Sequence, residues 1–384
     1  MRIAFYAPMK PPTSPRPSGE RFMARLLISA LKYAGHDVLL ASKLRSWNAK
    51  GENQAQKRIE SRASASINRL KKRFLSEPVG KRPDAWFTYH LYYKASDLIG
   101  PEISKALGIP YNVAEASHAP KRAKGEWASG HEAAEAAIRH ADHIISLNPT
   151  DTPCVQPLLK QNAAITHLKP FLDASNLFKA ANQSARNRDI LVRKLDLDPT
   201  VPILVTVAMM RDGDKFASYR NLADALERLK QTPWQLVIVG DGPKRKSVED
   251  LFANFNKKIT RFLGKKASRE IADILSSADL FLWPAVNEAY GMAILEAQAA
   301  GRPVIAANSG GVGQLIRDGS TGILTEKGNI QDFADAIKSL LSDPNRRLAM
   351  GEAAKNTVEK DHTLEEASKI IDFILVESNK GYSK

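Results

Sequence analysis

The sequence predicts an α/β protein built from two doubly wound domains. Its length of 384 residues exceeds the roughly 100–200 residues typical of one domain. Hydrophobic residues make up 43% of the chain and charged residues 26%, which is the balance of a globular protein with a sizeable core. Short β-rich apolar runs alternate with helix-length segments throughout, a pattern typical of parallel sheets covered by crossover helices.

Six strands are expected in each half of the chain. Those of the first half are Ile3–Ala7, Asp37–Ala41, Ala85–Thr88, Tyr111–Ala114, His143–Leu147 and Ile165–Leu168. Those of the second half are Ile203–Ala208, Gln235–Val239, Thr260–Leu263, Leu280–Trp283, Val304–Ala307 and Gly322–Leu324. We expect a first domain over residues 1–178 and a second over 179–363. The polar segment Ala180–Pro202, which ends in Asp-Pro-Thr-Val-Pro, is the expected hinge region.

Charge and cysteine content narrow the class of protein. The formal net charge is +14, and residues 43–82 alone hold 12 basic and 3 acidic residues. The single cysteine, Cys154, excludes an internal disulfide and is expected to be a buried or half-buried small hydrophobe. The first apolar run ends at Pro8, too early for a signal peptide, and no stretch approaches the roughly 18 apolar residues of a membrane span. We therefore expect a cytoplasmic protein.

Ligands of open α/β sheets bind beyond the carboxyl ends of the strands, so the turns that follow the strands are candidate sites. The first such turn, at Gly19, opens a helix over Phe22–Tyr33 and would let a ligand approach the backbone, or it is an ordinary strand-to-helix turn. In the second half, Arg211 and Lys215 could neutralise a diphosphate, or they form a solvated charged loop. Gly240 lies in the glycine-rich turn after the next strand.

The segment 287–297 directly follows an expected strand and is expected to become a helix. Its start would present free backbone N–H groups and the positive end of a helix dipole to a phosphate. Eight residues of helical rise would separate Glu288 from Glu296 by about 12 Å, so each carboxylate could hold one end of an extended ligand. The alternative is that Glu296 is a buried carboxylate satisfied by the backbone.

Several motifs in residues 200–325 closely resemble, in order and spacing, the retaining glycosyltransferases of family four, which have the GT-B fold. They are the E-x7-E block from Glu288 to Glu296, Ser276–Pro284, Ala299–Ala306, Ser309–Gly311, Val239–Pro243 and Phe262–Gly264. The first half is similar more loosely, around Gly19, His118 and Pro170–Asp173. The resemblance implies two Rossmann-like domains that face a central cleft. It also implies that a C-terminal helix, over residues 364–380, joins the first domain.

The resemblance implies a role for each matching residue. Glu288 would contact hydroxyls of a donor sugar, His118 would lie near that sugar, and Arg211 and Lys215 would bind the diphosphate. The other donor-binding positions that it implies are Gly19, Gly240, Leu263, Tyr290, Gly291, Met292 and Glu296, with Glu296 at the ribose hydroxyls.

The expected reaction is transfer of a sugar from a nucleoside-diphosphate sugar to a hydroxyl acceptor, such as a lipid-linked or envelope glycan. Fixed cations and a helix start can stabilise the departing diphosphate without a metal, so no metal or cofactor is expected. The resemblance implies that the anomeric configuration is retained. Two D-x-D patterns, Asp212-Gly213-Asp214 and Asp196-Leu197-Asp198, represent the metal-binding alternative.

Two other functions compete with this interpretation. The first is a nucleotide-sugar-binding protein without turnover, which would keep the same fold. The second is nucleic-acid binding, which the positive charge suggests. We do not expect it, because no nucleic-acid motif appears and aromatic residues do not interleave with the basic run.

Residues 56–75 predict a basic amphipathic helix, because apolar residues recur at three- and four-residue spacing among seven cations. Such a helix could hold the protein at an anionic membrane surface. Alternatively, it packs Ile59, Ile67 and Leu70 against its own domain, or its cations contact a soluble anionic acceptor.

Overall fold

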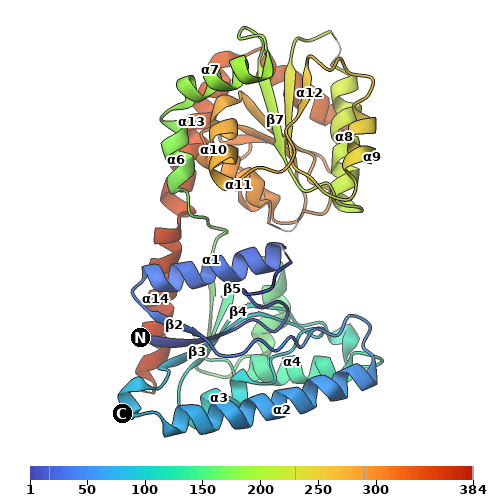
Figure 1. Ribbon diagram of the computed structural model, residues 1–384. Coiled ribbons are helices and arrows are strands. Elements are labelled where there is room, and N and C mark those ends of the chain that lie inside the picture. The colour runs from blue at the N-terminus through green and yellow to red at the C-terminus, as the bar shows by residue number, and fades with distance from the viewer. Residues whose placement is uncertain (17, 230, 289, 383–384) are drawn as a thin grey trace. The chain divides into compact units, whose positions relative to one another are not determined.

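The computed structural model describes residues 1–16, 18–229, 231–288 and 290–382. The chain divides into two compact units, Met1–Lys169 with Leu364–Lys384, and Pro170–Thr363. Each unit contains one six-stranded parallel sheet with helices on both faces (Figure 1). The predicted doubly wound α/β class is therefore confirmed.

The sheet of the first unit has the strand order β2-β1-β3-β4-β5-β6. Its strands are β1 (Arg2–Tyr6), β2 (Asp37–Leu40), β3 (Ala85–Leu91), β4 (Tyr111–Ala116), β5 (His143–Ser146) and β6 (Ala164–His167). One face is covered by α1 (Gly19–Tyr33) and α14 (Leu364–Lys380), which pack side by side (Figure 1). The other face carries α2 (Asn53–Ser76), α3 (Gly100–Leu107) and α4 (Ala128–His140). The four-residue helix α5 (Thr152–Val155) precedes β6.

The sheet of the second unit has the strand order β12-β11-β10-β7-β8-β9. Its strands are β7 (Ile203–Val207), β8 (Gln235–Val239), β9 (Thr260–Phe262), β10 (Leu280–Trp283), β11 (Val304–Ala307) and β12 (Gly322–Thr325). One face carries α8 (Asp214–Glu227), α9 (Arg245–Leu251) and α12 (Ile330–Leu341). The helices packed on the other face are α6 (Ser175–Ala181), α7 (Ser184–Leu195), α10 (Ser268–Ser277), α11 (Met292–Ala299) and α13 (Pro344–Asp361).

All twelve predicted strands are present, because central parallel strands are buried on both faces and must be apolar along most of their length. Every residue of β8 and β10, for example, is buried. The largest difference is at β3, which the sequence ends at Thr88. Pairing with β4 continues to Leu91 even though His90 interrupts the apolar run.

The predicted hinge region is wrong, because most of it is helical. Leu191 of α7 is buried in the core of the second unit, and Asn187 donates a hydrogen bond of 2.9 Å to Ser276 on α10. The domain boundary expected after residue 178 falls within α6, which also packs against α10. A charged helix with a narrow buried stripe has the composition of a polar linker, so composition alone misassigns it.

Helix α2 packs its apolar stripe against its own unit. Ala63, Leu70 and Phe74 are buried in the core of the first unit, and Ile67 packs against that core. Within the described part of the chain, five exposed cations of this helix have no ion-pair partner: Lys57, Arg58, Arg62, Arg69 and Lys72.

Two further predictions concern Cys154 and helices that could span a membrane. Cys154 is exposed, which corrects the expected burial, because the short helix α5 turns Val155 inward in its place. None of the helices described in the structure is both long enough and apolar enough to cross a bilayer.

Candidate functional site

The predicted residues of the second unit lie along the carboxyl edge of its sheet. The strand order changes direction between β7 and β10, and such a switch point is where open α/β sheets bind ligands. Arg211 lies in the loop after β7, and Glu288 lies in the loop after β10. Gly240 and Leu263 directly follow β8 and β9, the next strands along the same edge. Four consecutive strands therefore contribute to one edge.

Lys215 and Glu288 connect the two loops across the switch point. Lys215 lies in the first turn of α8, and its Nζ forms an ion pair with Oε2 of Glu288. The indole N–H of Trp283 donates to the same oxygen over 3.0 Å, and the ammonium lies 5.1 Å from the centre of the Trp283 ring. The Glu288 side chain is only 16% exposed, so this charge is partly shielded from water and yet accessible to a ligand.

Arg211 lies in a more open environment than Lys215. Its side chain is exposed and makes no hydrogen bond or ion pair with any residue that the structure describes. The nearby carboxylates have neighbours of their own: Asp212 lies 3.6 Å from Nζ of Lys244, and Asp214 accepts a hydrogen bond of 3.0 Å from Asn287. An anionic ligand could therefore bind the Arg211 guanidinium without breaking an existing contact.

Between the two glutamates of the E-x7-E block, the described residues form a loop that ends at Gly291 and then a short helix. Helix α11 begins only at Met292, after Gly291 adopts a left-handed φ of +68°. Asn287, with φ of +47°, is also left-handed. The separation of about 12 Å expected from continuous helical rise therefore does not apply. Tyr290 and Gly291 still precede a helix start whose first N–H groups have no intrahelical partner.

Glu296 lies within α11 and is only partly exposed. Burial raises its pKa to about 7. Among the residues described, no side chain or backbone N–H donates to its carboxyl group, so the alternative of a carboxylate satisfied by the backbone is not observed. A ligand whose hydroxyl groups donate hydrogen bonds to this carboxylate therefore gains binding free energy.

We expect the shifted pKa of Glu296 to make the protein less stable as the pH rises from about 4.5 to about 7. In this range the folded state keeps a proton that the unfolded state releases, so the free energy of unfolding falls by up to about 3 kcal/mol. Urea unfolding at pH 5 and pH 7.5 should show this loss in the wild type and not in Glu296→Gln. Equal losses in both proteins would contradict the assignment.

Gly240 and Leu263 hold neighbouring turns of this edge together. Gly240 has a φ of +152°, and a Cβ atom there would lie 1.9 Å from the carbonyl oxygen of Ala208. Its N–H donates to Gly264 over 3.0 Å, and the N–H of Leu263 donates to Ile238 over 2.9 Å. Glycine is therefore required at position 240 by packing against the chain that leaves β7.

The first unit has its own switch point, between β1 and β3. Gly19 is the first residue of α1, which is capped by Ser18, and Glu20 follows it. His90, near the end of β3, places Nδ1 2.7 Å from a carboxylate oxygen of Glu20 and 3.6 Å from one of Glu115. The sequence does not single out these three residues. The available signal is His90 itself, a polar residue that interrupts the apolar run near the end of β3.

His90 and Glu115 also share an unusual backbone conformation. Their φ angles are +63° and +61°, and such strain in residues other than glycine is concentrated at functional sites. Burial alone would lower the pKa of His90, but Glu115 and Glu20 outweigh it and raise that pKa. Burial would raise the pKa of Glu20, but hydrogen bonding and charge from His90 lower it. The edge of the first unit therefore favours the charged form of the His90–Glu20 pair.

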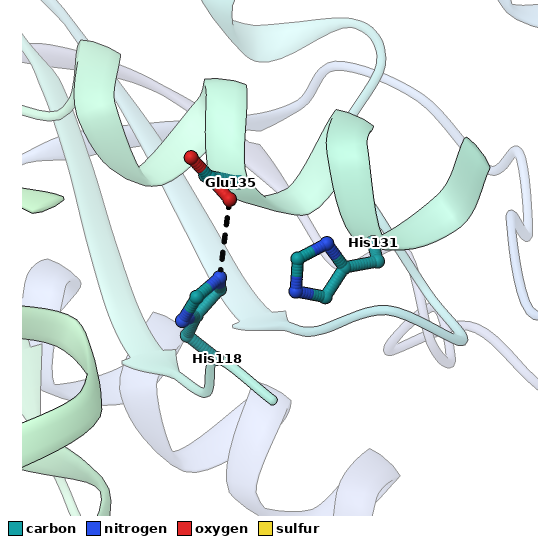
Figure 2. A group of neighbouring side chains, drawn as sticks. All are labelled: His118, His131 and Glu135. Atoms are coloured by element: carbon teal, nitrogen blue, oxygen red, sulfur yellow. Dashed lines mark hydrogen bonds and ion pairs between the residues drawn. The ribbon is translucent and has the colours of Figure 1, made fainter. Parts of the chain in front are cut away.

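His118 follows β4, the neighbour of β3. Its Nε2 lies 3.3 Å from Oε2 of Glu135, and its ring centre lies 4.7 Å from that of His131 (Figure 2). Both partners belong to α4. The sequence does not predict this contact between His118 and the helix.

Residues 188–357, which lie within the second unit and include the edge described above, match the family "Glycosyl transferases group 1". This segment of the second unit is therefore similar to that family. The match extends from α7 to α13 and contains Arg211, Lys215, Glu288 and Glu296.

One relative agrees with this similarity. A D-inositol 3-phosphate glycosyltransferase of Corynebacterium aurimucosum is 37% identical over 140 residues, which are 35% of this chain and 33% of that relative. The chain therefore spans about one third of that relative's length.

Solved structures are similar over nearly the whole chain. Anabaena Alr3699/HepE, solved with UDP, has a TM-score of 0.73 at 16% identity and covers 98% of this chain and 100% of its own. WaaG, described as a glycosyltransferase involved in lipopolysaccharide biosynthesis, has a TM-score of 0.65 at 16% identity, with coverages of 97% and 99%. At such identities these structures show the shared fold, which is the predicted GT-B fold.

Proposed function

We propose that this protein transfers a sugar from a nucleoside-diphosphate sugar to a hydroxyl acceptor, with retention of configuration and without a metal. The observation that carries the proposal is the Lys215–Glu288 ion pair at the switch point between β7 and β10. The match of residues 188–357 to the glycosyltransferase family supports sugar transfer. The Anabaena structure with UDP supports a nucleotide-sugar donor.

In this proposal the second unit binds the donor. Arg211 and Lys215 contact the diphosphate, and the N–H groups at the start of α11 add hydrogen-bond donors. Glu288, released from Lys215, accepts hydrogen bonds from the sugar, while Glu296 accepts them from the ribose. Before the donor arrives, the ion pair keeps the part-buried charges of Lys215 and Glu288 compensated.

The chemistry follows from where charge develops. When the bond between the anomeric carbon and the phosphate oxygen breaks, negative charge grows on the diphosphate, and fixed cations stabilise it. The acceptor hydroxyl attacks from the face that the diphosphate leaves. Its proton passes to the departing phosphate oxygen, so no protein nucleophile is required. The family resemblance supports a role for His118 near the donor sugar, and we assign the acceptor to the first unit.

The proposed function is tested by incubating the purified protein with labelled UDP, GDP and ADP sugars and following both transfer and donor hydrolysis. We expect activity with at least one donor to persist in excess EDTA, because Arg211, Lys215 and the start of α11 act in place of an ion. Loss of activity that magnesium or manganese restores would contradict this and would make Asp212 and Asp214 the candidate ligands. Donor binding without turnover would favour a non-catalytic nucleotide-sugar-binding protein.

We further propose that the acceptor is a lipid-linked or envelope glycan and that the protein reaches it at an anionic membrane surface. The involvement of WaaG in lipopolysaccharide biosynthesis supports such an acceptor. The apolar stripe of α2 is already packed in the core, so the attraction to the membrane would come from the exposed cations. Each cation near anionic lipid contributes about 1 kcal/mol, and salt screens the attraction.

Replacing Arg58, Arg62, Arg69 and Lys72 by glutamine should abolish sedimentation with anionic vesicles at low salt. A matched control replaces four exposed lysines of the second unit, Lys246, Lys257, Lys258 and Lys338, and should sediment like the wild type. Donor binding should be unchanged in both variants. A wild-type protein that ignores anionic vesicles at low salt would rule out the membrane role.

A further inference from the structure

Two histidines and a glutamate converge in the first unit (Figure 2). His118 follows β4, and His131 and Glu135 are four residues apart on α4, a spacing that puts them on the same face of the helix. One ring nitrogen of each histidine and one carboxylate oxygen all lie within 4.8 Å of one another.

His131 is the unusual member of this cluster. It is only 5% exposed, and its Nε2 has no hydrogen-bond partner among the described residues. Figure 2 shows the ring turned toward His118. Buried side-chain nitrogens are normally paired, because an unpaired one loses its hydrogen bonds to water without compensation. The position of this nitrogen therefore favours a ligand at the cluster.

We propose that His118, His131 and Glu135 bind a divalent transition-metal ion, with Zn²⁺ as the best fit. Two imidazoles and one carboxylate are a ligand set that zinc uses, with water in the fourth position. Calcium and magnesium prefer sites made of oxygen ligands only, so two imidazoles disfavour both.

The distances fit a tetrahedral site after a small adjustment. Bonds of about 2.0–2.2 Å place neighbouring ligand atoms about 3.3–3.6 Å apart. Nε2 of His118 and Oε2 of Glu135 are already 3.3 Å apart. The ligating nitrogen of His131, at most 4.8 Å from the others, has to approach by about 1 Å, which a change in its side-chain torsions can supply.

The surroundings orient one of the ligands. Arg139 donates to Oε1 of Glu135 over 2.8 Å and leaves Oε2 for the ion, and outer contacts of this kind orient ligating carboxylates.

An ion can reach the cluster from solvent. A surface pocket is lined by residues of α4 and the preceding loop, among them Ser129, His131, Glu132, Glu135 and Arg139. Two of the three ligands thus border a pocket through which an ion and its fourth, water ligand could enter.

A bound ion would also occupy the His118 nitrogen that the proposed function places near the donor sugar. We expect Zn²⁺ to inhibit sugar transfer and a chelator to restore it, an expectation that rests on the proposed function. Binding of the metal itself does not depend on the proposed function, so the two ideas can fail separately.

The test uses the untagged full chain, stripped of metal by a chelator and then titrated with Zn²⁺ by calorimetry. We expect one ion per chain and a loss of affinity of about 100-fold or more in His131→Ala. His140→Ala is the matched control, because His140 is another histidine of α4 that is part-buried and hydrogen-bonds Ser104. Co²⁺ provides a second readout through its visible absorption, which Glu135→Gln should change and His140→Ala should not.

Because His131 is buried, circular dichroism and thermal unfolding without metal must first show that His131→Ala is folded. If it is not, His131→Gln and Glu135→Gln take its place. The proposal is overturned if the wild type shows no saturable binding, or if His131→Ala binds as tightly as His140→Ala. Zinc binding in a protein that never transfers sugar would refute the proposed function and leave the metal site standing.

Discussion

Lys215→Met is expected to lower the rate of sugar transfer by about 100- to 1000-fold. The Lys215 ammonium lies at the start of α8, where the proposed mechanism develops charge on the leaving diphosphate. A single fixed donor at such a position typically contributes about 2.7–4 kcal/mol to the transition state. Methionine keeps an apolar side chain near Trp283 and removes the charge alone.

The rate should be measured at saturating donor, so that the loss is measured in kcat and not in donor affinity. Lys246→Met is the matched control, because Lys246 is fully exposed on α9 and pairs with Asp250 there. Unfolding midpoints of both variants separate lost catalysis from lost folding, since Lys215→Met leaves Glu288 without its ion pair. A variant within threefold of the wild-type rate would remove Lys215 from the proposed mechanism.

The strands and the edge residues could be predicted from the sequence for one shared reason. Parallel strands buried on both faces must be apolar, so β8 and β10 are recognisable in the sequence, and the residues after each strand must lie at the ligand-binding edge. That argument predicts that Arg211, Gly240 and Glu288 lie at this edge. The same argument does not identify the charged surface helix α7, because its narrow buried stripe gives only a weak apolar signal.

Contacts between distant segments could not be predicted in this way. Lys215 and Glu288 are 73 residues apart, and they meet only because β7 and β10 are neighbours, an order that apolar runs do not encode. The pairing of Glu20 with His90 depends likewise on β1 lying beside β3. The pKa of Glu296 is also a property of its surroundings, since burial alone raises it.

The two carboxylates of the E-x7-E block are expected to bind different parts of the donor. Glu296→Gln should weaken binding of the free nucleoside diphosphate and of the whole donor by about 10- to 100-fold, since hydrogen bonds to a charged group contribute about 1.5–3 kcal/mol. Glu288→Gln should leave the free nucleotide bound at least as tightly, because it releases Lys215 from its ion pair. Its loss should appear in the sugar-transfer step.

The pH dependence of nucleotide affinity separates these roles further. With its pKa raised to about 7, Glu296 must lose a proton before its carboxylate can accept ribose hydrogen bonds, so wild-type affinity should rise between pH 6 and pH 8. Calorimetry with UDP, GDP or ADP should show this additional rise in the wild type and in Glu288→Gln, but not in Glu296→Gln. The nucleotide's own phosphate titrates equally in all three experiments and cancels in the comparison. Equal loss of nucleotide affinity in both glutamine variants would contradict the assignment of one carboxylate to each end of the donor.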